Sequence, residues 1–145
     1  GSISVALEGS IGWEGAGWTL KYYKREFIRE TNMRARPFEA RAEESRRMLA
    51  KYPDRVPVHV ERARWSELAV LDRRKFLVPG YLTVGQFVHA IRTRLRVDAQ
   101  TSVFVFFGNR LMPTSATMAR VFAVGAEADG ILYATYAGEA TFGAG

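Results

Sequence analysis

Few residues of this chain have side chains that could carry out covalent chemistry. The 145 residues include no cysteine and two histidines, His59 and His89, which are far apart in the chain. An enzyme site needs a nucleophile or base held beside its partner, or a metal held by several ligands. No spacing of His, Asp and Glu in the sequence suggests such a cluster. The sequence therefore favours a binding protein over an enzyme and predicts neither a cofactor nor a metal.

The pentapeptide that begins at Lys75 is the clearest candidate for binding. Lys75, Leu77 and Pro79 face one side of a predicted strand, and Phe76 and Val78 face the other. Because proline cannot donate a hydrogen bond to a neighbouring strand, Pro79 favours a place at the edge of a sheet. An edge strand can accept an extended peptide as an additional strand, with side-chain pockets on both of its faces. A buried strand that ends at an ordinary proline is the alternative.

The composition indicates a globular protein with a sizeable core, since 48% of the residues are hydrophobic and 12% are aromatic. No apolar run is long enough to cross a bilayer, and the N-terminus lacks the pattern of a secretory signal. The lack of cysteine gives no sign of an oxidising compartment. These features together predict a cytoplasmic location.

The net charge of +6 is carried by the chain after Met33, and the sequence pI is about 10.0. Basic residues crowd the segment from Arg34 to Arg55. Such a field suits nucleic acid, anionic lipid or acidic protein segments about equally, and a solvated helix face needs no partner at all. A basic microtubule- or RNA-binding module is therefore the main alternative function. The chain lacks the aromatic residues interleaved with basic ones that bind single strands, so no specific nucleic acid is expected.

The periodicity of apolar residues predicts an α+β fold. A short amphipathic helix is predicted around Leu20 to Ile28, and residues 137–145 are expected to form a mobile tail. The order of the other elements is that of a β-grasp, the ubiquitin-like fold, with an extra helical segment in front. Those elements are a helix over 38–52, strands over 55–62 and 75–79, a helix over 84–95 capped by Thr83 and Gln86, a strand over 103–107, a helix over 113–121 and a strand over 131–136.

Several blocks of sequence carry a resemblance to a known family. They are Pro37-Phe38-Glu39, Lys51-Tyr52-Pro53-Asp54-Arg55-Val56-Pro57-Val58, Leu71-Asp72, Arg74-Lys75-Phe76-Leu77-Val78-Pro79, Leu82-Thr83-Val84-Gly85-Gln86-Phe87, Pro113-Thr114-Ser115-Ala116-Thr117-Met118, Asp129-Gly130, Leu132-Tyr133 and Thr141-Phe142-Gly143. From about Arg36 to Gly143 the chain resembles the ubiquitin-like modifiers of autophagy, which include the GABA-receptor-associated proteins and the microtubule-associated-protein light chains. The resemblance implies an N-terminal extension over 1–32, a modifier domain over 33–143 and a C-terminal segment, 144–145, that processing removes.

What the resemblance implies first is conjugation to a lipid. Such a modifier is trimmed after a C-terminal glycine by a cysteine protease, passed along by activating and conjugating enzymes, and joined to phosphatidylethanolamine on the autophagosome membrane. Gly143 matches that glycine, and Phe142 and Ala144 flank it. A glycine suits this role because a side chain would obstruct attack on the thioester. Gly145 is the alternative mature end. The implied location is cytoplasmic, and the autophagosome membrane after lipidation.

The resemblance also implies capture of receptors and adaptors that carry an aromatic-x-x-aliphatic motif, and it allows an association with microtubules. An extended motif of this spacing places its two anchors on opposite sides, so it requires pockets on both faces of one strand. The residues that match the aromatic pocket are Glu44, Met48, Pro57, His59, Lys75, Leu77 and Ile131. The residues that match the aliphatic pocket are Phe76, Val78, Pro79, Leu82 and Phe87. The residues expected to meet acidic groups beside the motif are Arg47, Lys51, Arg55 and Arg92.

The chain departs from the family at several of these positions. His59 replaces a usual aliphatic residue and Ile131 a common large aromatic one, so the first pocket would differ in shape. A histidine on the exposed face of a strand could make that pocket pH-sensitive, although a solvated histidine without a role is the simpler expectation. Ala90 would leave the second pocket roomier. Trp65-Ser66-Glu67-Leu68 has the form of the motif itself, but its place inside the domain predicts packing or a loop.

Residues 1–32 match nothing in the family. The apolar stripe that includes Leu20 and Phe27 is too short to form a stable helix alone, so it is expected to dock on a surface. A protein surface is favoured over an anionic membrane, because Glu26 and Glu30 offset part of its positive charge.

Overall fold

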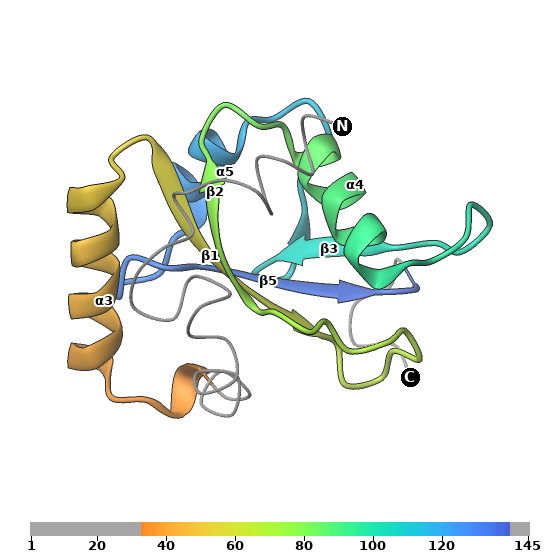
Figure 1. Cartoon of the computed structure of the whole chain (residues 1–145), viewed down its shortest axis with the longest axis horizontal. Helices are drawn as coiled ribbons and strands as arrows, with labels where there is room; N and C mark the ends of the chain where they lie inside the picture. Colours follow the sequence, from red (N-terminus) through yellow and green to blue (C-terminus); the bar gives the residue numbers. More distant parts are fainter. Residues whose placement is uncertain (1–32, 140–145) are drawn as a thin grey trace.

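The computed structural model describes residues 33–139 of the chain (Figure 1). The amphipathic helix predicted around Leu20 to Ile28 lies outside these residues, as does Gly143. The described elements are the short 3-10 helix η4 (Met33–Ala35), α3 (Phe38–Lys51), β1 (Arg55–Arg62), β2 (Lys75–Pro79), α4 (Val84–Leu95), β3 (Phe104–Phe107), β4 (Arg110–Leu111), α5 (Met118–Gly125) and β5 (Leu132–Ala137).

The strands form one mixed five-stranded sheet in the order β2-β1-β5-β3-β4. β1 pairs antiparallel with β2 and parallel with β5, and β5 pairs antiparallel with β3. The last strand of the chain therefore lies in the middle of the sheet, beside the first. This arrangement agrees with the predicted α+β fold, and it buries the apolar residues of β1, β2 and β5.

Helices cover both faces of the sheet (Figure 1). α4 packs through Phe87 and Ile91, whose side chains are fully buried. The ring centroid of Phe87 lies 6.3 Å from that of Phe76 on β2. α3 lies on the opposite face, where its Glu44 contacts Lys75, the neighbour of Phe76 in the strand. Successive residues of β2 therefore contact different helices.

The start of α4 confirms the predicted capping box. The backbone N–H of Gln86 donates to Oγ1 of Thr83 at 3.1 Å, and the backbone N–H of Thr83 donates to Oε1 of Gln86 at 3.0 Å. These bonds satisfy donors that the first turn of a helix leaves without partners. The helix ends at Leu95 and is capped by Arg96, which has a left-handed backbone with φ of 58°.

Tyr136 holds the long connection between β1 and β2. Its hydroxyl donates to the carbonyl of Ala69 at 2.6 Å and accepts from the backbone N–H of Leu71 at 2.9 Å. Trp65, earlier in the same connection, packs against a small cluster that includes Phe106. The prediction that Trp65 to Leu68 forms a packed loop is confirmed, and the connection fixes where β2 begins.

The structure corrects two predicted elements and adds a third that was not predicted. The helix predicted from Pro113 begins only at Met118, because Thr117 caps it by accepting from the N–H of Arg120 at 3.2 Å. The short strand β4, which pairs with the end of β3, was not predicted. The final strand extends to Ala137, so this buried residue does not belong to a tail.

Candidate functional site

β2 is the outermost strand on its side of the sheet, as Pro79 predicts, and its neighbour among the described strands is β1. In the antiparallel register Lys75 lies opposite His59, and Leu77 lies opposite Pro57. Residues that are directly opposite in such a pair project from the same face. Four residues of the predicted aromatic pocket therefore share one face of the sheet.

The structure brings the rest of the aromatic-pocket set to the same place. Glu44 and Met48 arrive from α3, and Ile131 immediately precedes β5, where Tyr133 lies opposite His59. The set is buried in this structure, and Glu44 of α3 is in direct contact with Lys75 of β2. The buried residues are Glu44, Met48, Pro57, His59, Lys75, Leu77 and Ile131.

Glu44 is a buried carboxylate between two cations. Its Oε2 lies 3.0 Å from Nζ of Lys75, and its Oε1 lies 2.8 Å from Nη1 of Arg36. The side chains of Lys75 and Glu44 are 1% and 3% exposed. The ion pair between α3 and β2 is therefore shielded from water. Removing one partner of a buried pair leaves a charge without solvation, which is strongly destabilising. The pair therefore holds α3 against the edge strand.

His59 does not lie on an exposed face of its strand. Its side chain is fully buried, and its ring centroid lies 5.7 Å from that of Tyr133. The expectation of a solvated histidine is wrong because β5 runs beside β1 and α3 packs over it. Alternation along β1 alone could not show that both faces of the strand are covered.

A hydrogen-bonded cluster around Asp129 borders this site. The Oδ2 atom of Asp129 accepts from Nη1 of Arg41 at 3.0 Å and from the hydroxyl of Tyr133 at 2.6 Å. Its Oδ1 atom accepts from the backbone N–H of Ile131 at 2.9 Å. Burial, followed by the hydrogen bond to Asp129, raises the pKa of the Tyr133 phenol well above its usual range. The cluster ties α3 to the start of β5.

Arg34 links η4 to the turn before β5 and to β5 itself. Its guanidinium pairs with Glu127 at 2.5 Å and lies 3.8 Å from the centroid of the Tyr133 ring. The hydrogen bond from Arg34 lowers the pKa of Glu127. Arg34, Arg36 and Arg41 are thus engaged by carboxylates, whereas Arg46, Arg47 and Lys51 remain exposed on α3. Their engagement was not predicted, because a lone carboxylate far along the sequence gives no signal of pairing.

Phe76 and Val78 of the aliphatic-pocket set lie on the opposite face of β2, towards α4, whereas Pro79 lies on the same face as Lys75. The rings of Phe76 and Phe87 meet edge to face, and the carbonyl of Pro79 accepts from the N–H of Leu82 at 3.1 Å. Ala90 on α4 is 2% exposed. This set belongs to the main core in the described structure. The buried residues are Phe76, Val78, Pro79, Leu82 and Phe87.

Comparison with known proteins identifies the family to which this fold and site correspond. The family model of the Atg8 ubiquitin-like autophagy proteins matches residues 40–143. The chain belongs to the Atg8 family. Its resemblance to autophagy modifiers and its β-grasp fold are thereby confirmed.

Relatives of the Atg8 family from distant organisms support the assignment. Autophagy-related protein 8a of Arabidopsis thaliana is 50% identical over 107 residues, which cover 74% of this chain and 88% of that protein. Autophagy-related protein 8 of Emericella nidulans is 46% identical over the same length and is covered to 91%. The crystal structure of Trypanosoma brucei ATG8 superposes with a TM-score of 0.69 at 42% identity, covering 74% of this chain and 93% of that one.

The four basic residues expected to meet acidic flanks lie on three elements of this Atg8 protein. Arg47 and Lys51 are exposed on α3, where Nη1 of Arg47 lies 3.8 Å from Glu43. Arg55 on β1 reaches across to β2 and donates to the carbonyl of Leu77 at 3.3 Å. Arg92 on α4 instead binds the loop that follows its own helix. Two of the four are therefore exposed on α3, and Arg55 contacts the edge strand itself.

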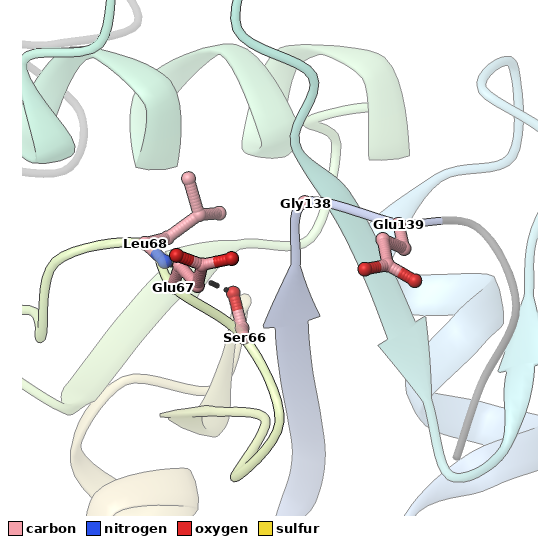
Figure 2. Close-up of a pocket in the computed structure, with 5 residues that line it drawn as sticks. All are labelled: Ser66, Glu67, Leu68, Gly138 and Glu139. Carbon is pink, nitrogen blue, oxygen red and sulfur yellow. Dashed lines mark hydrogen bonds between the residues drawn. The ribbon is translucent and has the colours of Figure 1, made fainter. Parts of the chain in front are cut away.

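The described chain ends four residues before Gly143, so the structure does not include that glycine. Beyond β5, Gly138 and Glu139 line a hollow together with residues of the β1–β2 connection (Figure 2). Figure 2 shows the carboxylates of Glu67 and Glu139 on different walls of this hollow, and Ser66 accepts from the N–H of Leu68. The start of the C-terminal segment therefore has a carboxylate on each wall of this hollow.

Residues 33–139 contain neither a metal-binding cluster nor a membrane-spanning helix. No group of three or more histidines and carboxylates in this range could hold a metal ion. None of the helices in the same range is long and apolar enough to cross a membrane.

Proposed function

We propose that this chain is a modifier conjugated through Gly143 to phosphatidylethanolamine on autophagosomal membranes, and not an enzyme. The Atg8 family model ends at Gly143, which supports this residue as the mature end. A cysteine protease would remove Ala144 and Gly145, and activating and conjugating enzymes would then carry Gly143 as a thioester. The protein would be cytoplasmic before conjugation and bound to the membrane after it.

We also propose that β2 captures receptors and adaptors that carry an aromatic-x-x-aliphatic motif. One observation supports this most directly: β2 is an outer strand whose two faces carry the two predicted pocket sets. An added strand would extend the sheet, with its aromatic anchor towards α3 and its aliphatic anchor towards α4. Arg47, Lys51 and Arg55 would attract acidic residues beside the motif.

The burial of both sets implies that capture is accompanied by opening of the site. The aromatic anchor has to enter between α3 and β2, a boundary that the Glu44–Lys75 pair spans. Opening costs free energy, and the affinity of a peptide is reduced by the fraction of the protein that is closed. Acidic residues on the peptide can offset this cost by pairing with the positive charge of Lys75 when its contact with Glu44 loosens.

Conjugation is tested by reconstitution with the family's protease, activating and conjugating enzymes and vesicles that contain phosphatidylethanolamine. Mass spectrometry should place the lipid on Gly143, and Gly143→Ala should block both trimming and attachment because the methyl group obstructs the thioester. Gly138→Ala is the matched control, since its added Cβ would make only ordinary contacts at 3.7 Å. Lipid found on Gly145 would contradict the assignment.

Peptide capture is tested by following backbone amide resonances during titration with an acidic peptide that contains Trp-x-x-Leu. The largest shifts should fall on β2 and on the facing residues of α3, and a peptide with both anchors replaced by alanine should cause none of them. Shifts confined to the outer side of α4 would show that the edge-strand proposal is wrong.

A further inference from the structure

A basic hollow lies on the outer side of α4, away from both predicted pockets. It has a volume of about 490 Å³ and is formed by the last two turns of the helix and the loop that follows. Its lining residues are His89, Arg92, Thr93, Arg96, Val97 and Ala99. The lining contains no carboxylate side chain, so the hollow has the electrostatic character of an anion-binding surface.

The two arginines of the hollow are held in different ways. The guanidinium of Arg92 donates to the carbonyls of Thr101 and Asp98, which fix its position without cancelling its charge. Arg96 is exposed, and no hydrogen bond or ion pair of its side chain occurs within the described structure. The nearby carboxylate of Asp98 already accepts from the hydroxyl of Thr101 at 2.8 Å and from two backbone N–H groups. One arginine therefore shapes the hollow, and the other is available to a ligand.

The hollow lies at the end of the molecule where the chain leaves towards Gly143. Arg92 binds the loop at Thr101, and the next residue, Ser102, has its carbonyl oxygen 3.7 Å from the position of a Cβ on Gly138. In Figure 1, the end of α4, the loop after it and the arrowhead of β5 all point to the same side of the molecule. Four extended residues beyond Glu139 reach about 14 Å, so a lipid joined to Gly143 would keep this end close to the membrane.

We propose that the basic hollow of α4 docks on the phosphate groups of anionic lipids in the membrane to which Gly143 is joined. The inference rests on the proposed conjugation, because the tether brings this end of the molecule to the lipid surface. Basic side chains near an anionic leaflet are attracted to it within a Debye length. Arg96 supplies the mobile contact, and Val97 and Ala99 supply small apolar contacts at the rim.

The acidic hollow beside Gly138 makes the docking directional. Glu67 and Glu139 line the neighbouring hollow (Figure 2), and an anionic membrane repels them. Attraction on the α4 side and repulsion on the Glu67 side together orient the domain. The α4 hollow faces the lipid, and Glu67 is turned away from it.

The test couples the full chain to lipid without the conjugating enzymes. Because the sequence has no cysteine, Gly143→Cys provides one coupling point for a maleimide-bearing lipid in nanodiscs. A spin-labelled lipid then broadens the amide resonances of residues near the membrane. We expect residues 89–97 to be broadened in discs that contain phosphatidylserine, and much less in discs of phosphatidylcholine alone.

Two matched variants of the coupled chain test the charge. Arg96→Asn removes the charge at a position with φ of 58°, where asparagine is well tolerated, and should lower the docked-to-undocked ratio about fivefold. Arg46→Gln removes a charge from α3 that is also exposed, and it should leave the broadening of residues 89–97 unchanged.

Three results would overturn the proposal. They are equal broadening in neutral discs, broadening centred on Glu67 and Glu139, and insensitivity to Arg96→Asn. An acidic peptide that shifts residues 89–97 in the uncoupled chain while lipid does not would assign the hollow to a protein partner instead. Chemical coupling keeps the two proposals separate, because failed enzymatic conjugation would leave the orientation of the coupled chain measurable.

Discussion

Arg41 on α3 and Asp129 before β5 form an ion pair of 3.0 Å between residues that are 88 positions apart in the chain. The exposed fractions of their side chains are 14% and 1%, so the pair is largely shielded from water. Asp129 also accepts from Tyr133 and Ile131, and Ser45 of α3 donates to its backbone carbonyl. This cluster joins the helix in front of the sheet to the last strand of the domain.

We expect Asp129→Asn to lower the free energy of unfolding by about 1 to 3 kcal/mol. The amide keeps the shape of the carboxylate but loses its charge, and a buried donor is left without its proper acceptor. Arg46→Gln is the control, because its exposed pair with Glu43 should contribute under about 1 kcal/mol. Urea denaturation compares the two variants. Equal effects would show that the Asp129 cluster does not stabilise the domain.

The turn at Gly130 offers a test that separates backbone strain from steric clash. Gly130 has φ of 81°, and a Cβ there would lie 2.6 Å from Oγ of Ser45. Gly108 also has a positive φ, of 65°, but a Cβ there would meet nothing within 4 Å. We expect Gly108→Ala to cost about 1 kcal/mol from strain alone and Gly130→Ala clearly more. Denaturation midpoints in the reverse order would contradict this account.

The pair of Arg34 with Glu127 should make stability depend on pH below neutrality. The pKa of Glu127 in the folded protein is lowered by Arg34, so the unfolded chain binds protons more readily as the pH falls below about 4.5. The stabilisation is present above that value and is lost as the pH falls through the folded-state pKa. Because both side chains are substantially exposed, the effect should be about a few tenths of a kcal/mol.

Thermal unfolding between neutral pH and about pH 3 should therefore show a slightly shallower loss of stability in Glu127→Gln than in the wild type. Arg34→Gln should flatten the same part of the profile, because either change removes the pair. A profile that is altered by Glu127→Gln but not by Arg34→Gln would assign the effect to another neighbour of Glu127.

Leu77→Ala should weaken the binding of a Trp-x-x-Leu peptide by about 1 to 3 kcal/mol, the usual contribution of one buried aliphatic side chain. Calorimetric titration gives the affinity. Because Leu77 is fully buried, the same variant should also lose stability, so binding is measured well below its unfolding temperature. Leu111→Ala, at the far edge of the sheet and 49% exposed, is the control that should bind normally. Unchanged affinity in Leu77→Ala would contradict peptide binding at β2.

Local patterns in the sequence were sufficient for much of the fold and for the edge strand. The capping box of Thr83 and Gln86 and the apolar stripe of α4 depend on neighbours within one or two helical turns. The position of β2 at an edge follows from the missing N–H of Pro79. Such features could be predicted because the interacting atoms are close together in the chain.

The tertiary structure decided which predicted features are buried and which charges are paired. His59 is covered by elements that begin far from it in the sequence, and alternation along one strand cannot show this. Arg34, Arg36 and Arg41 appear as one basic run, but Glu127, Glu44 and Asp129 engage them after folding. Burial and ion pairing depend on distances between segments that only the packed chain brings together, so local sequence patterns could not determine them.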